Sequence, residues 1–431
     1  MSFDLLLKGG TVVEPHQVTI CDIAVKDGVI VKIAPNIESE GAPTVELYNK
    51  IVLPGAIDAH VHFNEPGNVE WEGIETGSKM LAAGGATLYF DMPLNSNPPT
   101  IDVQSLQLKE ELSAEKSIID YRFWGGLVPE NINELEGLAE RGVIGFKAFI
   151  SNSGFEPFQS VDNMALLSGM KEINRLGKIL ALHAESDEMT SFLAKQKIMD
   201  GKLEPKDYCE TRPIAAEVEA VQRALAYAEV TGCALHFVHI SSPEAVYIIN
   251  EAKNRGLDVS LETCAHYLLF NDEAFETHGV FAKCAPPLRD PNVQQKLIDL
   301  VVEGKIDFIT SDHSPCSPEL KDLSKVNFFE AWGGISGGQF TLLSMLEIAK
   351  NYQLPLTAVA KLTAQAPAAR FGIENKGNIA IGFDADFAIV EETSFVVTKD
   401  NMYAKHKESI YENYKFNYQV VATYCKGNRV F

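Results

Sequence analysis

The chain has 431 residues, which exceeds the length at which a single hydrophobic core usually stops growing. This length predicts a large α/β domain with a smaller part attached. Hydrophobic residues make up 46% and charged residues 22%, a globular composition that argues against a disordered chain. The formal net charge of -22 argues against nucleic acid or an anionic membrane as a partner, because phosphate binding needs a basic surface.

Targeting and redox features predict a soluble, cytoplasmic protein. The apolar runs are too short to cross a bilayer, and the first residues, "MSFDLLLKGG", lack a basic region followed by a cleavable apolar one. Seven cysteines without CxxC spacing indicate reduced thiols rather than a disulfide framework or a thiolate zinc site.

Both ends of the chain are rich in β-strand patterns. An alternating run, then Asp27-Gly28, then a second apolar run predicts a hairpin within the first 50 or so residues. Residues 377–392 and 420–431 are also strand-like, the second stretch broken by a Lys-Gly-Asn turn. We expect residues 1–52 and 375–431 to pair into one small β-sandwich domain.

Between these ends, short apolar runs alternate with helical patterns such as 74–85, 161–177 and 243–256, as in βα units around a parallel sheet. Eight such runs predict a (β/α)8 TIM-like barrel over residues 53–374, with its active site at the carboxyl ends of the strands. The runs are 55–63, 86–93, 120–129, 143–150, 178–185, 234–241, 258–268 and 306–315. A doubly wound open sheet is the alternative, but no GxGxxG or Walker sequence follows the first run.

Two long connections, roughly 186–214 and 315–340, follow predicted strands. We expect both to be loops, and loops of that length are usually functional or disordered.

Polar residues recur where the predicted strands end. In an extended strand residues i and i+2 point to the same face, so His60 and His62 present two imidazoles to one point, which suits a divalent metal. The other residues at strand ends are Lys147, His183, His239 and Asp312.

Each histidine also has a structural explanation. A lone buried histidine is more often a hydrogen-bonded core residue than a ligand, which applies to His183 taken alone. His236 lies three residues before His239, on the other face, and we interpret it as structural. His266 and His313 are supporting or substrate-side candidates. We assign no role to the three histidines in turn-like contexts, His16, His278 and His406.

Lys147 lies in the apolar run "VIGFKAFI", where a buried ammonium is costly. The common outcome for such a lysine is that it snorkels to solvent or pairs with a carboxylate. The alternative is that its neutral amine reacts with carbon dioxide to form a carbamate whose two oxygens bridge two metals.

These residues resemble the amidohydrolase superfamily along essentially the whole chain. The similarity rests on "DAHVHF", "GFKAF", the histidines ending strands five and six, "SDHSP" and "GFDADFAIV". Within the superfamily the match is to the cyclic amidases, which include allantoinases, dihydroorotases and hydantoinases. That group implies a (β/α)8 barrel with a small β-sandwich, a binuclear metal centre bridged by a carboxylated lysine, and commonly a homotetramer.

The resemblance implies which residues bind which metal. His60, His62 and Asp312 would hold one ion and His183 and His239 the other, with Lys147 (N6-carboxylysine, formed with CO2) between them. Histidine and carboxylate ligands favour zinc, with manganese, cobalt and iron as alternatives. A metal-bridging hydroxide is then the expected nucleophile, and Asp312 the proton shuttle to the leaving nitrogen.

Asn64 bears on the substrate. Dihydroorotases typically have arginine at this position to bind a carboxylate, and asparagine instead offers a donor and an acceptor that suit a neutral ureido or amide group. The alternative is that Asn64 only forms a turn. The other predicted substrate contacts are Asn95 and the loops that contain Cys284 and Gly337.

Several stretches, among them "HVHFNEPG", "WEGIETGS" and "EAWGGISGGQF", look most like the allantoinases within the group. The resemblance predicts metal-dependent hydrolysis of the hydantoin ring of allantoin, a small neutral substrate, to allantoate. The first alternative is a hydantoinase (dihydropyrimidinase) or a dihydroorotase. The second is a catalytically inactive relative that acts as a scaffold, although such proteins lose metal ligands and all six are present here.

Overall fold

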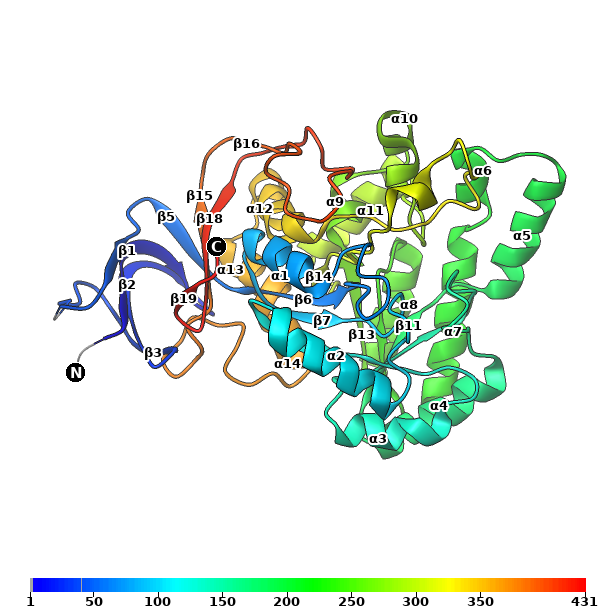
Figure 1. The fold of residues 1–431 in the computed structure, drawn as a ribbon, viewed down its shortest axis with the longest axis horizontal. Coiled ribbons are helices and arrows are strands. Elements are labelled where there is room, and N and C mark those ends of the chain that lie inside the picture. Colours follow the sequence, from blue (N-terminus) through cyan, green and yellow to red (C-terminus); the bar gives the residue numbers. More distant parts are fainter. Residues whose placement is uncertain (1–2, 40) are drawn as a thin grey trace.

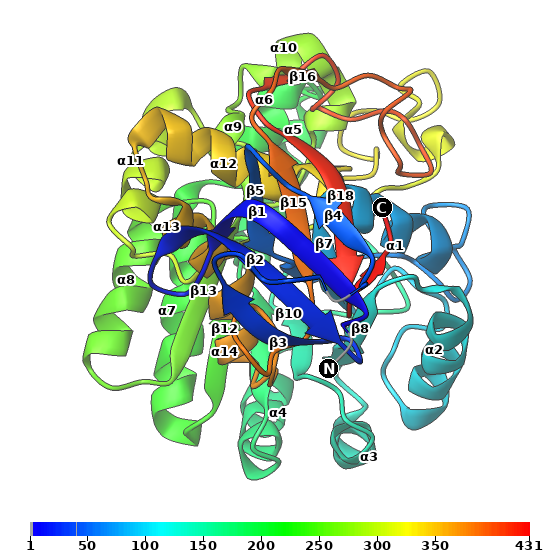
Figure 2. The same ribbon diagram turned by 90° about the vertical axis from the view of Figure 1, so that its left-hand side faces the viewer.

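The structure, a computed structural model, describes residues 3–39 and 41–431. It has two parts, a β-sheet built from both ends of the chain and a barrel of parallel strands surrounded by helices (Figure 1). Turned by 90°, the terminal sheet lies in front of the barrel and contains strands from both halves of the terminal region, such as β1 and β18 (Figure 2).

The terminal sheet has eight strands in the order β19-β18-β15-β5-β1-β2-β3, with β4 beside β1. The two predicted hairpins are confirmed, and β15 pairs antiparallel with β5, which joins the two ends of the chain. The inner face of the sheet buries one apolar cluster that includes Leu7, Ile23 and Phe387. The strands are β1 (Leu5–Val13), β2 (Val18–Lys26), β3 (Val29–Ala34), β4 (Thr44–Glu46), β5 (Lys50–Pro54), β15 (Phe387–Glu391), β18 (Gln419–Cys425) and β19 (Asn428–Arg429).

One strand prediction in this region is partly wrong. Residues 377–386 are irregular, and the strand begins only at Phe387. Asp384 and Asp386 both turn to the ammonium of Lys376, and Gly382 adopts a φ of 91°, so this stretch cannot stay extended.

The barrel has all eight predicted strand positions. The pairings between neighbouring barrel strands are parallel, and a bridge between Val61 and His313 closes the ring between the first and last positions. Trp124 interrupts the third position, which is therefore split in two. The strands are β6 (Ala56–Val61), β7 (Ala86–Asp91), β8 (Asp120–Phe123), β9 (Gly125–Gly126), β10 (Phe146–Phe149), β11 (Ile179–His183), β12 (Ala234–Phe237), β13 (Val259–Cys264) and β14 (Phe308–Thr310).

Helices follow the strands as predicted, and caps fix several of their ends. The Asp162 side chain accepts a hydrogen bond from the Ala165 N–H at the start of α4, and Gly232 ends α7 in the left-handed region. The helices are α1 (Ile74–Ala83), α2 (Val103–Lys116), α3 (Leu135–Glu140), α4 (Asn163–Arg175), α5 (Asp187–Met199), α6 (Pro205–Glu210), α7 (Ile214–Thr231), α8 (Pro243–Asn254), α9 (Ala265–Leu269), α10 (Ala274–His278), α11 (Pro291–Val302), α12 (Thr341–Tyr352), α13 (Leu356–Ala360) and α14 (Ala366–Arg370).

The two predicted long loops differ. The stretch 186–214 is mostly helical, since it contains α5 and α6, so the prediction of a loop there is wrong. The stretch 315–340 is largely irregular and holds only two short 3-10 helices, η3 (Pro318–Lys321) and η4 (Gly338–Phe340). The run 258–268 ends as a strand at Cys264 and continues as α9.

A C-terminal excursion, residues 397–414, leaves the terminal sheet and lies against the loops at the carboxyl end of the barrel. It connects β16 (Phe395–Val396) to β17 (Lys415–Phe416). The Lys405 N–H donates to Glu72 at 3.1 Å, and the Ser409 hydroxyl donates to the Ser336 carbonyl at 2.5 Å. In Figure 1 this orange-red segment passes beside α9, in agreement with the contact of Phe270 and Tyr411 at 5.0 Å.

In the described part of the chain, no helix is both long and apolar enough to cross a membrane.

Candidate metal centre and active site

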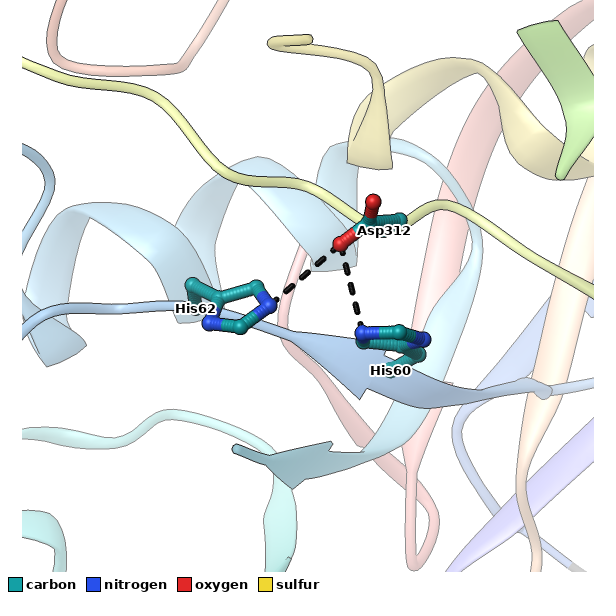
Figure 3. A group of neighbouring side chains, drawn as sticks. All are labelled: His60, His62 and Asp312. Atoms are coloured by element: carbon teal, nitrogen blue, oxygen red, sulfur yellow. Dashed lines mark ion pairs between the residues drawn. The ribbon is translucent and has the colours of Figure 1, made fainter. Parts of the chain in front are cut away.

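His60 near the end of β6, His62 just beyond it and Asp312, two residues after β14, form a compact cluster. His60 Nε2 lies 3.2 Å and His62 Nε2 lies 3.3 Å from the same Asp312 oxygen, Oδ1 (Figure 3). The second carboxylate oxygen of Asp312 points away from both rings (Figure 3). The three ligand atoms lie within 4.8 Å of one another, close enough to hold one metal ion.

A second pair of histidines lies at the ends of the neighbouring strands β11 and β12. His183 Nδ1 is 3.0 Å from His239 Nε2, so one nitrogen of each ring faces the same point. Burial lowers the pKa of both rings, most strongly that of His239, which keeps them neutral and able to donate a lone pair.

Backbone conformation helps to aim two of these side chains. His239 has a φ of 39° and Asp312 a φ of 43°, in the left-handed region that side chains rarely adopt. Such strain persists only where the surrounding structure imposes it, and it is concentrated at functional sites.

Lys147 on β10 is fully buried, and its Nζ has no hydrogen-bond partner among the described residues. Burial lowers the pKa of this amine to about 8, although Asp312 and Glu262 act in the opposite direction. The amine is therefore neutral in an appreciable fraction of molecules near neutral pH.

All six predicted ligands line one cavity of about 230 Å³ at the carboxyl end of the barrel. This volume is below the range of pockets for drug-sized ligands, so the cavity suits a small substrate. Other lining residues include Leu94, Asn95, Phe149, Asn152, Tyr208, Arg212, Lys283, Ala285 and residues 329–333.

Two buried carboxylates support the histidines, and the sequence analysis missed both. Glu262 on β13 lies 2.6 Å from His60 Nδ1 and 3.0 Å from His236 Nε2. Glu185 lies 2.8 Å from His183 Nε2 and pairs with Arg212. Carboxylates in this position orient a metal-binding imidazole and raise its basicity. Two clues were present in the sequence. Glu262 is a charged residue inside the apolar run of β13, and Glu185 is a charged residue at the second position after His183.

Comparison with known proteins agrees with this geometry. A family model described as "Amidohydrolase family" matches residues 51–430. The chain belongs to the amidohydrolase family. Membership implies a divalent metal centre, and the cluster of His60, His62 and Asp312 is a candidate ligand group for it.

Curated relatives of the chain include proteins named allantoinase. The allantoinase of Bacillus velezensis is 53% identical over the whole of this chain and 94% of its own length. That of Deinococcus radiodurans is 48% identical over 90% of this chain and 87% of its own.

Solved structures of hydantoinases share the fold. The L-hydantoinase (dihydropyrimidinase) from Arthrobacter aurescens superimposes with a TM-score of 0.95 at 29% identity, covering 99% of this chain and 96% of that one. The dihydropyrimidinase from Brevibacillus agri NCHU1002 gives 0.92 at 26% identity, covering 98% and 94%. The barrel with its terminal β-sheet is thus the fold of the cyclic amidases within the amidohydrolases.

The four predicted substrate contacts of this amidohydrolase lie in different places. Asn95 lines the cavity, with Nδ2 at 3.2 Å from His62 Nδ1. The lining found among the described residues does not include Asn64, Cys284 or Gly337, whose contacts stay predictions. Asn64 is buried with a φ of 65°, which fits a turn residue, although its Oδ1 has no partner in the described part.

Cys284 and Gly337 contact aromatic side chains of other elements. The carbonyl of Cys284 accepts a hydrogen bond from the Tyr208 hydroxyl at 3.1 Å, and Gly337 lies against the Tyr411 ring. The ring of His313, a supporting candidate, lies 3.2 Å from Glu72, and its backbone carbonyl accepts a hydrogen bond from the N–H of the predicted ligand His62 at 2.8 Å.

Proposed function

We propose that this amidohydrolase is an allantoinase that hydrolyses the hydantoin ring of allantoin to allantoate. The observation that supports it most directly is the 53% identity to an allantoinase over the whole chain, in a protein whose six candidate ligands line one small cavity. Asn64, in place of an arginine, favours a neutral ring over an anionic one.

The proposed ligands are two sets joined by Lys147. His60, His62 and Asp312 would hold one divalent ion and His183 with His239 the other. The unpartnered, partly neutral amine of Lys147 is suited to react with CO2 to give the bridging carbamate. We propose zinc, because neutral imidazoles and carboxylates with open positions are typical of catalytic zinc sites.

When bound, the two cations lower the pKa of water and polarise the amide carbonyl. The chain's own groups then direct the proton. Asp312 would hold an ion through Oδ1, the oxygen that faces His60 and His62, and its second oxygen, which points away from both rings, would accept the proton of the attacking water. As the ring C–N bond breaks, Asp312 returns this proton to the leaving nitrogen, acting first as general base and then as general acid.

Glu262 and Glu185 keep the imidazoles in place during these steps. Glu262 accepts a hydrogen bond from His60 Nδ1 and Glu185 from His183 Nε2, which fixes the tautomer of each ring and leaves the other nitrogen free to hold an ion.

Substrate assays test the proposal. Purified enzyme loaded with zinc is compared on allantoin, hydantoin, dihydrouracil and dihydroorotate, and we expect the highest kcat/KM on allantoin. Preference for hydantoin or dihydrouracil would favour the second candidate, a hydantoinase, which the TM-score of 0.95 makes the main rival. Activity confined to dihydroorotate would overturn the interpretation of Asn64, and no activity on any ring would favour the scaffold alternative.

We also propose that the protein forms a homotetramer, as the resemblance to cyclic amidases implies. The exposed side chains of Phe192, Ile198 and Met199 on α5 are an apolar surface of the kind that subunit contacts cover. Light scattering that gives the 47.4 kDa of one chain would contradict this.

A further inference from the structure

We propose that Lys283 and Lys321 are positioning residues that hold residues 326–334, here called the lid segment, over the active-site cavity by binding its backbone carbonyls. The proposal rests on the proposed function only in taking a cyclic amide as the substrate.

The lid segment forms one wall of the cavity but has no helix or strand of its own. Its residues 329–333 line the cavity with the metal ligands. At its far side Trp332 packs edge-on against Trp71 of the loop after β6, at 4.7 Å. Most backbone carbonyls in proteins find partners in secondary structure, so an irregular, partly buried segment needs other donors.

The two lysines supply those donors. Lys283 Nζ donates to the Phe329 carbonyl at 3.0 Å and to the Ala331 carbonyl at 2.5 Å. Lys321 Nζ donates to the Gly334 carbonyl at 2.6 Å. In the described part of the chain, no backbone N–H donates to any of these three carbonyls.

Neither lysine is explained by an ordinary ion pair. Lys283 is 3% exposed and Lys321 is 8% exposed, and no described carboxylate lies within salt-bridge distance of either ammonium. Lys283 instead lies 4.7 Å from the centre of the Tyr208 ring and 5.4 Å from that of Phe328. Burying two ammonium groups without a carboxylate partner costs free energy. Their hydrogen bonds to the carbonyls of the lid segment offset this cost.

The electrostatic surroundings make Lys283 sensitive to pH. Burial, Arg212 from the turn after α6 and Lys321 from η3 lower its pKa to about 7, and Tyr208 from α6 faces it with a neutral ring. As pH rises through this value Lys283 loses its charge, its bonds to the carbonyls weaken, and the hold on the lid segment relaxes.

Kinetics of three variants test the proposal. In Lys283→Met and Lys321→Met we expect KM to rise about tenfold with a smaller change in kcat, since one ammonium–carbonyl bond corresponds to roughly that factor. The matched control is Lys178→Met. Lys178 makes the same kind of bond, to the Val143 carbonyl at 2.8 Å, but lies before β11 at the opposite end of the barrel, so its KM should not change.

Limited trypsin digestion gives a readout that needs no turnover. Lys325 directly precedes the lid segment, and its side chain is 62% exposed. We expect faster cleavage after Lys325 in the two lid-lysine variants than in the wild type or Lys178→Met, with the fragment identified by its mass. This readout remains valid if the wild type prefers another ring, so failure of the lid proposal is distinct from failure of the allantoinase proposal.

A conservative variant separates anchoring from mere packing. Lys283→Arg keeps its charge at all accessible pH values, so its KM should stay flat with pH while that of the wild type rises above about pH 7 relative to it. Unchanged KM and unchanged cleavage in both methionine variants would overturn the proposal. So would equal losses of kcat and kcat/KM without faster cleavage, because that result places the defect at the metal ligands. If the methionine variants do not fold, the test is the KM of the wild type divided by that of Lys283→Arg, measured against pH. A ratio that does not change with pH would contradict the lid proposal.

Discussion

Two buried lysines in this barrel show how context decides the chemistry of one residue type. Lys109 and Lys147 are at most 1% exposed. Lys109 pairs with Asp91 at 2.8 Å and donates to the Met92 carbonyl, which is the ordinary way to bury an ammonium. Lys147 has neither kind of partner in the described part of the chain and faces imidazoles instead. A neutral, reactive amine is the form that fits these surroundings.

Replacing Lys147 tests its role as a bridge. In Lys147→Ala we expect the metal content to fall below two ions per chain and kcat/KM to fall by more than about a hundredfold, since even residues that only support a ligand cost 10–100-fold. Elemental analysis after dialysis and the allantoin assay measure the two effects. Lys79→Ala, on the exposed face of α1, is the control. Two retained ions with full activity would remove the bridging role.

At the scale of elements, α1 positions the metal-binding end of β6 through one close contact. Phe63 follows His62, and its buried ring lies under Gly77 of α1. A Cβ at Gly77 would lie 2.4–2.7 Å from three ring atoms of Phe63, and that ring is itself packed against Tyr89 at 4.6 Å. Only glycine lets the helix approach the strand end this closely.

Gly77→Ala should therefore destabilise the protein even though alanine is the better helix former. Overpacking costs about 1–3 kcal/mol, and the gain in helix propensity offsets at most about 1 kcal/mol. We expect a lower midpoint of urea unfolding, and a lower kcat because the shifted ring displaces His62. The control is Lys79→Ala on the same helix. Wild-type stability and activity in Gly77→Ala would mean that the Phe63 ring moves aside freely.

The elements that the sequence predicted well are those whose pattern is local. Eight apolar runs and the i, i+2 spacing of His60 and His62 are visible along the chain, and they fixed the barrel and one half of the candidate site. Contacts across elements have no such pattern. Glu262 on the seventh strand position reaches His60 on the first, and Lys283 reaches the lid segment across 46 and 48 residues. The stretch 186–214 looked like a loop because its helices α5 and α6 carry little buried apolar surface.

At the scale of the whole molecule, one buried ammonium ties the terminal sheet to the barrel. Lys376 Nζ lies 2.6 Å from Asp120 of β8, 2.9 Å from Asp384 and 2.6 Å from Asp386, the last two just before β15. Asp120, Asp386 and Cys425 are close enough together to suggest a second metal site. The ammonium groups of Lys376 and Lys426 already pair with these carboxylates, so we interpret the cluster as structural.

Removing this ammonium should weaken the whole chain in a pH-dependent way. Burial alone raises the pKa of Asp120, but Lys376 and Lys426 lower it overall, and burial raises the pKa of Asp386 despite Lys376. In Lys376→Met the three carboxylates would lie together without their main cation, at a cost of about 3–5 kcal/mol when they are charged.

The sign of the pH effect follows from these shifts. A depressed carboxyl pKa such as that of Asp120 contributes stability above its unfolded value, and that stability is lost as pH falls through the folded value. In Lys376→Met the carboxyl groups have lost their main cation, so their pKa values are higher than in the wild type. They therefore become protonated and neutral at a higher pH as the solution is acidified. The loss relative to wild type should therefore be largest near about pH 7.5 and smaller near about pH 5. Urea unfolding at both pH values measures it, with the exposed Lys202→Met as control. A loss of equal size at both would mean that Lys376 acts through packing, and the link between sheet and barrel would then not be electrostatic.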